Sequence, residues 1–498
     1  MIEDFWKDKY PAGIAADINP DEYPNIQAVL KQSCQRFANK PAFSNLGKTL
    51  TYGELYELSG AFAAYLQQHT DLQPGDRIAV QLPNVLQYPV AVFGAIRAGL
   101  IVVNTNPLYT AREMEHQFND SGAKALVCLA NMAHLAEAVV PKTGVKHVIV
   151  TEVADLLPPL KRLLINSVIK YVKKMVPAYH LPKAIKFNDV LSKGHGQPVA
   201  EASPDSGDVA VLQYTGGTTG VAKGAMLTHR NLVANMLQCK ALMGSNLNEG
   251  CEILITPLPL YHIYAFTFHC MAMMLIGNHN ILISNPRDLP AMVKELSKWK
   301  FSGFVGLNTL FVALCNNEGF RKLDFSALKV TLSGGMALQL AAAERWWQQL
   351  PPAVRSAIDY LEEPLADSRQ LPLLHQACGL PYAWDESLCQ HWQQRSLPAS
   401  CPAGLAALVV KPMVVGGEAA VAALANIAAD WRITLVLSSA LEASIGLCEV
   451  ARLAAIYSPD QTAGLDTWQA FGQDLLQPLA PGRQVLALSQ LQLRWSGP

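Results

Sequence analysis

Short β-rich runs alternate with helical segments along most of this 498-residue chain. Helical periodicity is clear at residues 54–66. The β-rich runs lie at 124–130, 147–153, 209–214, 251–256, 279–284, 302–307 and 329–333. Strands that alternate with helices form largely parallel sheets with helices on their faces. The pattern therefore predicts an α/β fold.

The overall composition excludes several classes of protein. Half of the residues are hydrophobic, 16% are charged and the formal net charge is −1. This balance excludes a largely disordered chain and gives no overall field that would attract nucleic acid. The ten cysteines never form a CxxC pair, which indicates a reducing compartment. With no signal-peptide pattern and no apolar run of about 18 residues, we expect a soluble cytoplasmic protein.

The composition changes near Trp346. Lys411 is the only lysine after Lys329, and seven of the nine tryptophans lie at Trp346 or later. This change indicates either two domains with different surfaces or two pieces of different ancestry. We expect one domain at 1–346, with subdomains at about 1–200 and 201–346, and a second domain at 347–498.

Residues 160–177 form a basic amphipathic segment. A solvated surface helix with extended lysines is the simpler interpretation of this pattern. Peripheral contact with an anionic membrane is the alternative.

A run rich in glycine and threonine, residues 214–224, directly follows a β-rich run. Glycines let backbone N–H groups converge on an anion, threonine hydroxyls add donors, and Lys223 adds a positive charge. The spacing differs from that of a Walker A loop, because glycine follows Lys223. A flexible surface turn is the alternative, but the density of these residues favours a phosphate-binding loop. The candidate nucleotide-binding residues are Thr215, Gly216, Gly217, Thr218, Thr219, Gly220 and Lys223.

This run resembles the phosphate loop of AMP-forming acyl-CoA synthetases, in the adenylate-forming superfamily. Other stretches agree with that family in order and spacing. Residues 50–55 resemble its early "TYxEL" motif, 257–262 its aromatic/His motif beside the acyl pocket, and 332–336 the turn that borders adenine. The resemblance extends from the first residues to about Trp346 and is closest to bacterial long-chain-fatty-acid–CoA ligases.

The resemblance implies that ATP activates a fatty acid to acyl-AMP and that CoA then accepts the acyl group. Lys223, backbone donors and Mg²⁺ would stabilise the phosphoryl charge. Gly334 and Gly335 would border the nucleotide, and His262 would have a catalytic role. The alternative for His262 is a packed histidine in an aromatic cluster. The family's Mg²⁺-binding Glu, ribose-binding Asp and lid lysine have no counterpart after Trp346, so the match covers a partial AMP-binding domain.

Strand-like runs in the last third of the chain each end in a polar residue: Glu362, Asp385, Lys411 and Ser438. They follow one another at intervals of about 25 residues, with helix-like segments between them. A (β/α) barrel builds its active site from residues at the carboxyl ends of successive parallel strands.

Four short motifs together resemble the enolase superfamily and most closely o-succinylbenzoate synthase. They lie at residues 362–364, 384–387, 411–412 and 438–442. The resemblance covers about residues 355–498. It implies that Glu362 and Asp385 bind Mg²⁺, that Lys411 is catalytic, and that Ser438 and Ser439 bind the o-succinylbenzoate precursor. The alternatives are helix-capping carboxylates and serines.

This second match is also partial. A third carboxylate, a K-x-K base and the first strands are missing, so we expect the C-terminal half of an enolase-type (β/α) barrel. Three interpretations stay open: a fatty-acid–CoA ligase, an o-succinylbenzoate synthase-type lyase of menaquinone biosynthesis, or a chimera with neither activity. The chimera would arise by gene fusion or sequence mis-assembly. Two motif sets that meet at one point favour it.

Overall fold

The computed structural model describes residues 15, 17–215, 222–243, 247–334, 348, 360–365, 367–438, 444–459 and 461. The described part of the chain divides into two compact units between Ser333 and Gly334. The domain boundary predicted at 346 lies outside the described residues and stays a prediction. Each unit is taken by itself below.

The first unit contains a seven-stranded sheet in which only the β8–β9 pair is antiparallel. Its strands in spatial order are β7 (Ile185–Lys186), β6 (His147–Thr151), β5 (Ala123–Leu129), β3 (Arg77–Gln81), β4 (Ile101–Asn104), β8 (Val209–Thr215) and β9 (Lys223–Thr228).

The same unit contains a six-stranded sheet in which only the β1–β2 pair is antiparallel. Its strands in spatial order are β13 (Val330–Ser333), β12 (Gly303–Gly306), β10 (Ile253–Thr256), β11 (His279–Leu282), β1 (Pro41–Asn45) and β2 (Lys48–Thr51). Each β-rich run expected from the sequence overlaps one of the strands of these two sheets. The predicted α/β fold is confirmed for this unit.

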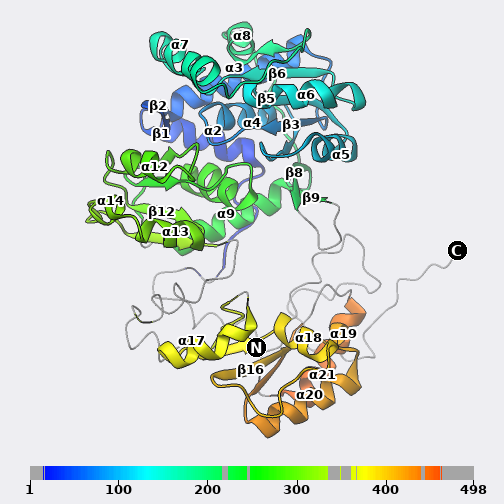
Figure 1. The fold of residues 1–498 in the computed structure, drawn as a ribbon. Helices are drawn as coiled ribbons and strands as arrows, with labels where there is room; N and C mark the ends of the chain where they lie inside the picture. Colours follow the sequence, from blue (N-terminus) through cyan, green and yellow to red (C-terminus); the bar gives the residue numbers. More distant parts are fainter. Residues whose placement is uncertain are drawn as a thin grey trace, which may run out of the picture. The chain divides into compact units, whose positions relative to one another are not determined.

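Helices connect the strands and cover the sheets (Figure 1). The α-helices are α2 (Ile26–Arg36), α3 (Tyr52–His69), α4 (Gln87–Arg97), α5 (Ala111–Ser121), α6 (Ala133–Val139), α7 (Pro159–Ser167), α8 (Phe187–Gly194), α9 (His229–Met243), α10 (Ile263–Ala265), α11 (Met273–Leu275), α12 (Leu289–Leu296), α13 (Asn308–Cys315) and α14 (Glu318–Arg321). The 3₁₀ helices are η1 (Ala130–Met132) and η2 (Val140–Lys142), and the π-helices are η3 (Val168–Val172) and η4 (Phe266–Ala272).

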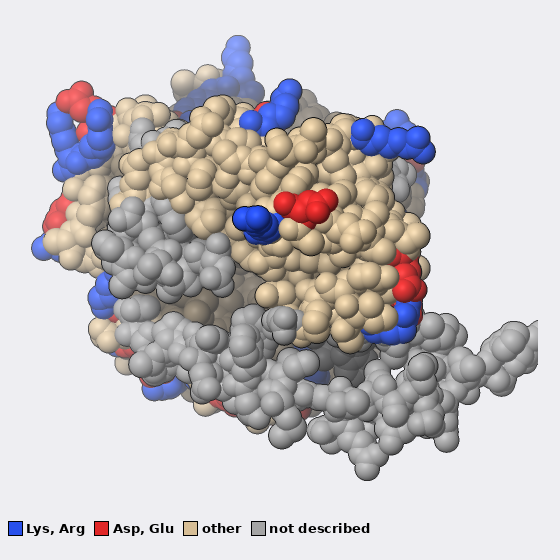
Figure 2. Space-filling view, turned by 90° about the horizontal axis from the view of Figure 1, so that it is seen from below, with Lys and Arg blue, Asp and Glu red and all other residues tan. Residues whose placement is uncertain are grey.

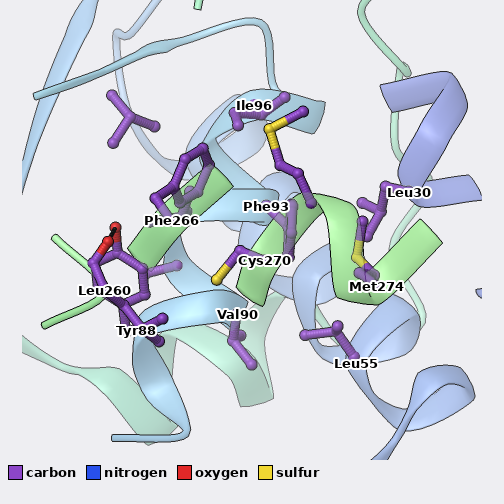
Figure 3. Packing of buried hydrophobic residues seen from close by; sticks show 14 of the residues in the cluster. Leu30, Leu55, Tyr88, Val90, Phe93, Ile96, Leu260, Phe266, Cys270 and Met274 are labelled. Carbon is purple, nitrogen blue, oxygen red and sulfur yellow. Dashed lines mark hydrogen bonds between the residues drawn. The ribbon is translucent and has the colours of Figure 1, made fainter. Parts of the chain in front are cut away.

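The largest hydrophobic cluster joins helices to strands of both sheets. Figure 3 shows its centre, where Leu30 of α2, Leu55 of α3, Phe93 of α4 and Cys270 of η4 pack together. Strictly apolar residues at these positions remove a large area from water, which is the main favourable term in folding.

The early "TYxEL" motif has a structural role at the start of α3. Thr51 Oγ1 accepts a hydrogen bond from the Glu54 N–H at 3.1 Å, and the Glu54 carboxylate accepts one from the Thr51 N–H at 2.8 Å. This capping box satisfies two donors that the helix leaves free. Buried Tyr52 donates from its hydroxyl to the Asn278 carbonyl, which ties the motif to the residue before β11.

The second unit contains a four-stranded parallel sheet with a helix after each strand. The strands are β14 (Leu361–Glu362), β15 (Tyr382–Trp384), β16 (Leu405–Val410) and β17 (Thr434–Leu437). The helices are η5 (Ser368–Gln370), α17 (Leu371–Cys378), α18 (Glu386–Gln393), α19 (Pro412–Val415), α20 (Glu418–Trp431) and α21 (Ser444–Tyr457). The strand–helix alternation is as expected, whereas the enolase-type barrel stays a prediction.

Two surface features of the described residues concern charge and apolar length. On the face drawn in Figure 2, charged side chains of the described residues are scattered among uncharged ones, so that face carries no extended field of one sign. In the described part of the chain, no helix combines the length and the apolar character needed to cross a bilayer.

Candidate functional site

The β8–β9 hairpin fixes both ends of the predicted phosphate loop. Thr215, the last residue of β8, lies opposite Lys223, the first residue of β9, in the antiparallel register. Both side chains are exposed at the mouth of the loop. Gly216, Gly217, Thr218, Thr219 and Gly220, which form the loop between them, lie outside the described residues.

Helix α5 holds both arms of this hairpin. The Tyr214 hydroxyl donates to Asp120, and His116 Nε2 lies 3.0 Å from the Ala222 carbonyl oxygen. Burial and the Asp120 carboxylate raise the pKa of Tyr214, so the phenol stays protonated and remains a donor. The same helix lines a cavity of about 450 Å³ that includes His116 and Asp120. Sequence reasoning missed both residues, because only the fold brings α5 to the hairpin.

Gly224 lies at the base of the loop, against the ring of Tyr214. A Cβ at this position would lie 2.9 Å from the ring of Tyr214, which is directly opposite in the register. Glycine therefore lets the ring lie flat across the hairpin and reach Asp120.

The other two predicted motifs follow strands of the six-stranded sheet. Residues 257–262 come directly after β10, and Gly334 comes directly after β13. β10, β12 and β13 are adjacent and parallel, so these segments leave the sheet at the same edge. In open α/β sheets, ligands bind in crevices at the carboxyl ends of the strands. Gly335 lies outside the described residues.

Asn84 joins the carboxyl edges of the two sheets. It follows β3 of the first sheet and is 2% exposed. Its Nδ2 donates to the carbonyls of Thr256 and Leu258 at 2.9 and 2.8 Å, and its Oδ1 accepts from the Leu260 N–H at 2.8 Å. Asn84 therefore sets the position of the segment that leads to His262. No pattern in the sequence marks this residue.

His262 is the N-cap of the short helix α10. Its Nδ1 accepts a hydrogen bond from the Tyr264 N–H at 3.3 Å, so the ring proton is on Nε2. The ring edge is exposed, but desolvation by the surrounding protein lowers its pKa, which favours the neutral imidazole near pH 7. Tyr261 and Tyr264 pack against the main core beside it. The capping bond does not decide between the catalytic role and the packed-histidine alternative, and both stay predictions.

The second unit brings Glu362, Asp385 and Lys411 together. They lie at the carboxyl ends of the adjacent parallel strands β14, β15 and β16. Lys411 Nζ lies 2.5 Å from Asp385 Oδ2. Burial, and then the neighbouring Asp385 charge, raise the pKa of Glu362. Burial acts to lower the pKa of Lys411, but the hydrogen bond to Asp385 and its charge outweigh that effect and raise it.

Asp385 does not cap helix α18 with its side chain, although it occupies the N-cap position. Glu363 serves the start of that helix instead, because its carboxylate accepts hydrogen bonds from the backbone N–H groups of Asp385 and Ser387 at 2.9 and 2.8 Å. The helix-capping alternative is therefore wrong for Asp385. Glu363 was not predicted to have this role.

The arrangement fits a hard cation. Asp385 is 4% exposed and its Oδ1 has no hydrogen-bond partner among the described residues. Two neighbouring carboxylates with a free oxygen suit Mg²⁺, which takes one or two carboxylates and keeps water ligands. In the described part of the chain, no group of three or more His, Cys, Asp or Glu residues could hold a metal ion, so this candidate site has only two carboxylates. Ser438 directly follows β17, and its N–H donates to the Val410 carbonyl; Ser439 lies outside the described residues.

Comparison with known proteins identifies the family of the first unit. Residues 30–358 match the family model described as AMP-binding enzyme. The chain is 53% identical over 341 residues to the long-chain-fatty-acid–CoA ligase of Escherichia coli O157:H7. This alignment covers 68% of this chain and 61% of that protein. It is 33% identical over 346 residues to the ligase of the same name from Bacillus subtilis, covering 68% of this chain and 60% of that protein.

Solved structures show the same fold. A long-chain-fatty-acid–CoA ligase from Archaeoglobus fulgidus has a TM-score of 0.55 at 22% identity, covering 76% of this chain and 66% of that structure. An anthranilate CoA ligase with bound anthranoyl-AMP also has a TM-score of 0.55, at 19% identity, covering 66% of this chain and 59% of that one. The chain spans about three-fifths of the length of its curated relatives. On the extent of the family match, this chain belongs to the AMP-binding enzyme family.

Proposed function

We propose that the chain activates a fatty acid with ATP and transfers the acyl group to CoA. The observation that carries this proposal is the β8–β9 hairpin, which presents Thr215 and Lys223 on either side of a loop rich in glycine and threonine. Relatives at 48 to 53% identity are named long-chain-fatty-acid–CoA ligases, which supports a fatty acid as the carboxylate substrate.

The reaction has two displacements. A carboxylate oxygen of the fatty acid attacks the α-phosphorus of ATP, and pyrophosphate leaves. The CoA thiolate then attacks the acyl carbon, and AMP leaves. Lys223, Thr215 and the loop between them stabilise negative charge that develops on the phosphoryl oxygens. Mg²⁺, when bound, neutralises phosphate charge. We assign His262 to the acyl side and Gly334 and Gly335 to the nucleotide side of the site.

Replacing Lys223 with alanine is expected to reduce fatty-acid-dependent ATP–pyrophosphate exchange by about 100-fold or more, because a cation aimed at developing charge is lost. The measurement is incorporation of labelled pyrophosphate into ATP by the full chain. Lys322→Ala is the matched control, since Lys322 is 72% exposed and, among the described residues, forms its ion pair with Glu318 of the adjacent helix α14. Exchange that persists in Lys223→Ala and equals the control contradicts the loop assignment.

A second candidate function rests on Glu362, Asp385 and Lys411. We propose that the second unit holds Mg²⁺ through the two carboxylates, as in an o-succinylbenzoate synthase-type lyase. Glu362 and Asp385 would hold the ion where it supplies positive charge to a substrate carboxylate and to the enediolate intermediate of such a lyase; the base for that step has no counterpart in the matched residues. Lys411 would place its positive charge on the same intermediate, and Ser438 and Ser439 would bind the distal carboxylate. The free, buried Asp385 Oδ1 is the observation that favours this proposal.

Replacing Asp385 with asparagine is expected to abolish divalent-cation binding by the second unit, because one of its two carboxylates is lost. Binding is measured in the full chain with Mn²⁺ as a paramagnetic probe and Mg²⁺ as competitor. Asp430→Asn, on the exposed side of α20, is the control. Unchanged Mn²⁺ binding in Asp385→Asn rules out this cation site.

The third interpretation, a chimera of two partial enzymes with neither activity, also stays a prediction. Amplification of source DNA across the codons for Ser333 to Glu362 separates its two origins, gene fusion and mis-assembly. A product of the expected length supports a continuous gene, and its absence supports mis-assembly.

A further inference from the structure

Large apolar side chains are exposed along one short segment of the first unit, residues 160–179, here called the outer strip. It includes α7 and η3. Seven of the fifteen exposed large hydrophobic side chains in the described residues lie in it. Leu160 is 84% exposed, Leu163 68% and Val172 74%. Scattered exposed leucines are ordinary, but a contiguous set marks a site of interaction.

The orientation of α7 is the reverse of that of a normal surface helix. Leu160, Leu163 and Leu164 follow an i, i+3, i+4 pattern, so they share one face, and that face points to solvent. A polar residue, Asn166, is buried on another face. In a helix that covers a core, the apolar face is the buried one.

Hydrogen bonds fix this reversed orientation. Asn166 Oδ1 accepts from the Ala154 N–H at 3.0 Å, and Asn166 Nδ2 donates to Glu152 Oε2 at 3.0 Å and to Asp155 Oδ1 at 3.3 Å. Turning the helix to bury its leucines would break all three bonds and leave a buried amide without partners. The exposed leucines are therefore held in place by the fold.

The segment that carries the outer strip is itself positively charged, while the nearby carboxylates of Glu152 and Asp155 are bound to Asn166 on the protein side of α7. Residues 156–188 contain seven Lys or Arg and no Asp or Glu, in a chain whose formal net charge is −1. Lys170 precedes the exposed Tyr171 and Val172 of η3, and Lys173 and Lys174 lie between Val172 and the exposed Met175. This combination complements an anionic lipid surface, because apolar side chains enter the headgroup region while lysines bind lipid phosphates. The same charge opposes docking of a second copy, which would place like charges face to face.

We propose that the outer strip docks the chain onto an anionic bilayer surface, with Leu160, Leu163, Leu164 and Val172 inserted at headgroup depth. The proposal goes beyond the proposed function and does not depend on it, because it concerns the surface of α7 and η3 alone.

Sedimentation with sucrose-loaded vesicles tests the proposal on the full chain. The vesicles are phosphatidylcholine alone, or phosphatidylcholine with about 30% phosphatidylglycerol. We expect binding to the anionic vesicles that weakens as salt is added, and little binding to the neutral ones. Failure to bind anionic vesicles at low salt overturns the proposal.

Two sets of substitutions separate the apolar and charged contributions. The combined change Lys170→Gln, Lys173→Gln and Lys174→Gln is expected to weaken binding about 100-fold, since each lysine near an anionic surface contributes about five-fold. The combined change Leu160→Gln, Leu163→Gln and Leu164→Gln is expected to weaken it at least about ten-fold. Because these side chains are exposed, both variants should keep the parent's urea midpoint.

Leu108→Gln with Leu242→Gln is the matched control, since both leucines are exposed outside the outer strip. Its binding should equal that of the parent chain. Vesicle binding that neither set of substitutions weakens overturns the proposal. The proposal is also overturned if, in size-exclusion chromatography, the parent chain elutes as a dimer and the leucine variant elutes as a monomer. A second copy of the chain would then occupy the outer strip.

Discussion

Replacing Gly194 with alanine is expected to lower the free energy of unfolding by about 3 kcal/mol or more, near the upper end for overpacking. Gly194 ends α8 where this helix crosses α3. A Cβ at Gly194 would lie 1.8 Å from the carbonyl oxygen of Ala61 and 2.8 Å from its carbonyl carbon. Both are backbone atoms, so no side-chain rotation relieves the clash, and α8 must move away from α3. That movement also separates the Phe187 and Phe62 rings, whose centroids are 5.4 Å apart.

Gly207→Ala is the matched control for this change. A Cβ at Gly207 meets no atom within 4 Å, and the residue does not have a left-handed φ. Its free energy of unfolding, derived from the urea midpoint, should stay within about 0.5 kcal/mol of the parent's. Equal urea midpoints for both variants would contradict a tight α8–α3 crossing.

The first unit is expected to lose stability steeply between pH 6.5 and pH 4. Burial lowers the pKa of His229, His269 and His279 from 6.5 to about 4. In this window the unfolded chain binds protons that the folded chain does not, so unfolding becomes more favourable as the pH falls. The contribution is fully present above pH 6.5. Each histidine contributes up to about 3 kcal/mol to the change.

His269 shows the physical cause most clearly. Its Nδ1 lies 2.8 Å from Asn280 Oδ1 and 3.1 Å from Thr256 Oγ1. Its Nε2 is buried and has no partner among the described residues. A proton added to Nε2 would place a charge and a donor where nothing accepts it, which burial strongly disfavours.

Urea unfolding of His269→Gln at pH 7.5 and at pH 5 measures this contribution. We expect a smaller difference in stability between the two pH values than in the parent chain, because one titrating group is gone. His195→Gln is the control, since His195 is exposed and its removal leaves the buried histidines in place. An unchanged difference in His269→Gln would mean that this histidine is not a source of the acid sensitivity.

Much of the fold follows from local patterns in the sequence. Strands such as β5 and β10 are buried and rich in β-branched or apolar residues, and Thr51 and Glu54 have the spacing of a capping box. These signals depend on neighbours within a few positions, so one sequence is enough to recognise them.

Features that depend on tertiary contacts could not be predicted in this way. The periodicity of residues 160–177 shows that one face of the segment is apolar, but periodicity alone does not say which face meets the protein. Only the hydrogen bonds of Asn166 decide the orientation. The spacing of Glu362, Asp385 and Lys411 predicted a common sheet edge, whereas the Lys411–Asp385 pair and the role of Glu363 depend on side-chain positions.

The contacts of Asn84 have a consequence for how the first unit moves. Residues 257–262 belong to no strand and would ordinarily fluctuate as a loop does. The buried side-chain amide of Asn84 nevertheless binds the Leu258 carbonyl and the Leu260 N–H in this segment, and the Thr256 carbonyl at the strand end before it. Local opening of this segment would break these bonds together. The Leu260 N–H, the backbone donor in this set, should therefore exchange with deuterium as slowly as the N–H groups of the core strands, and mobility at this edge must come from segments that Asn84 does not hold.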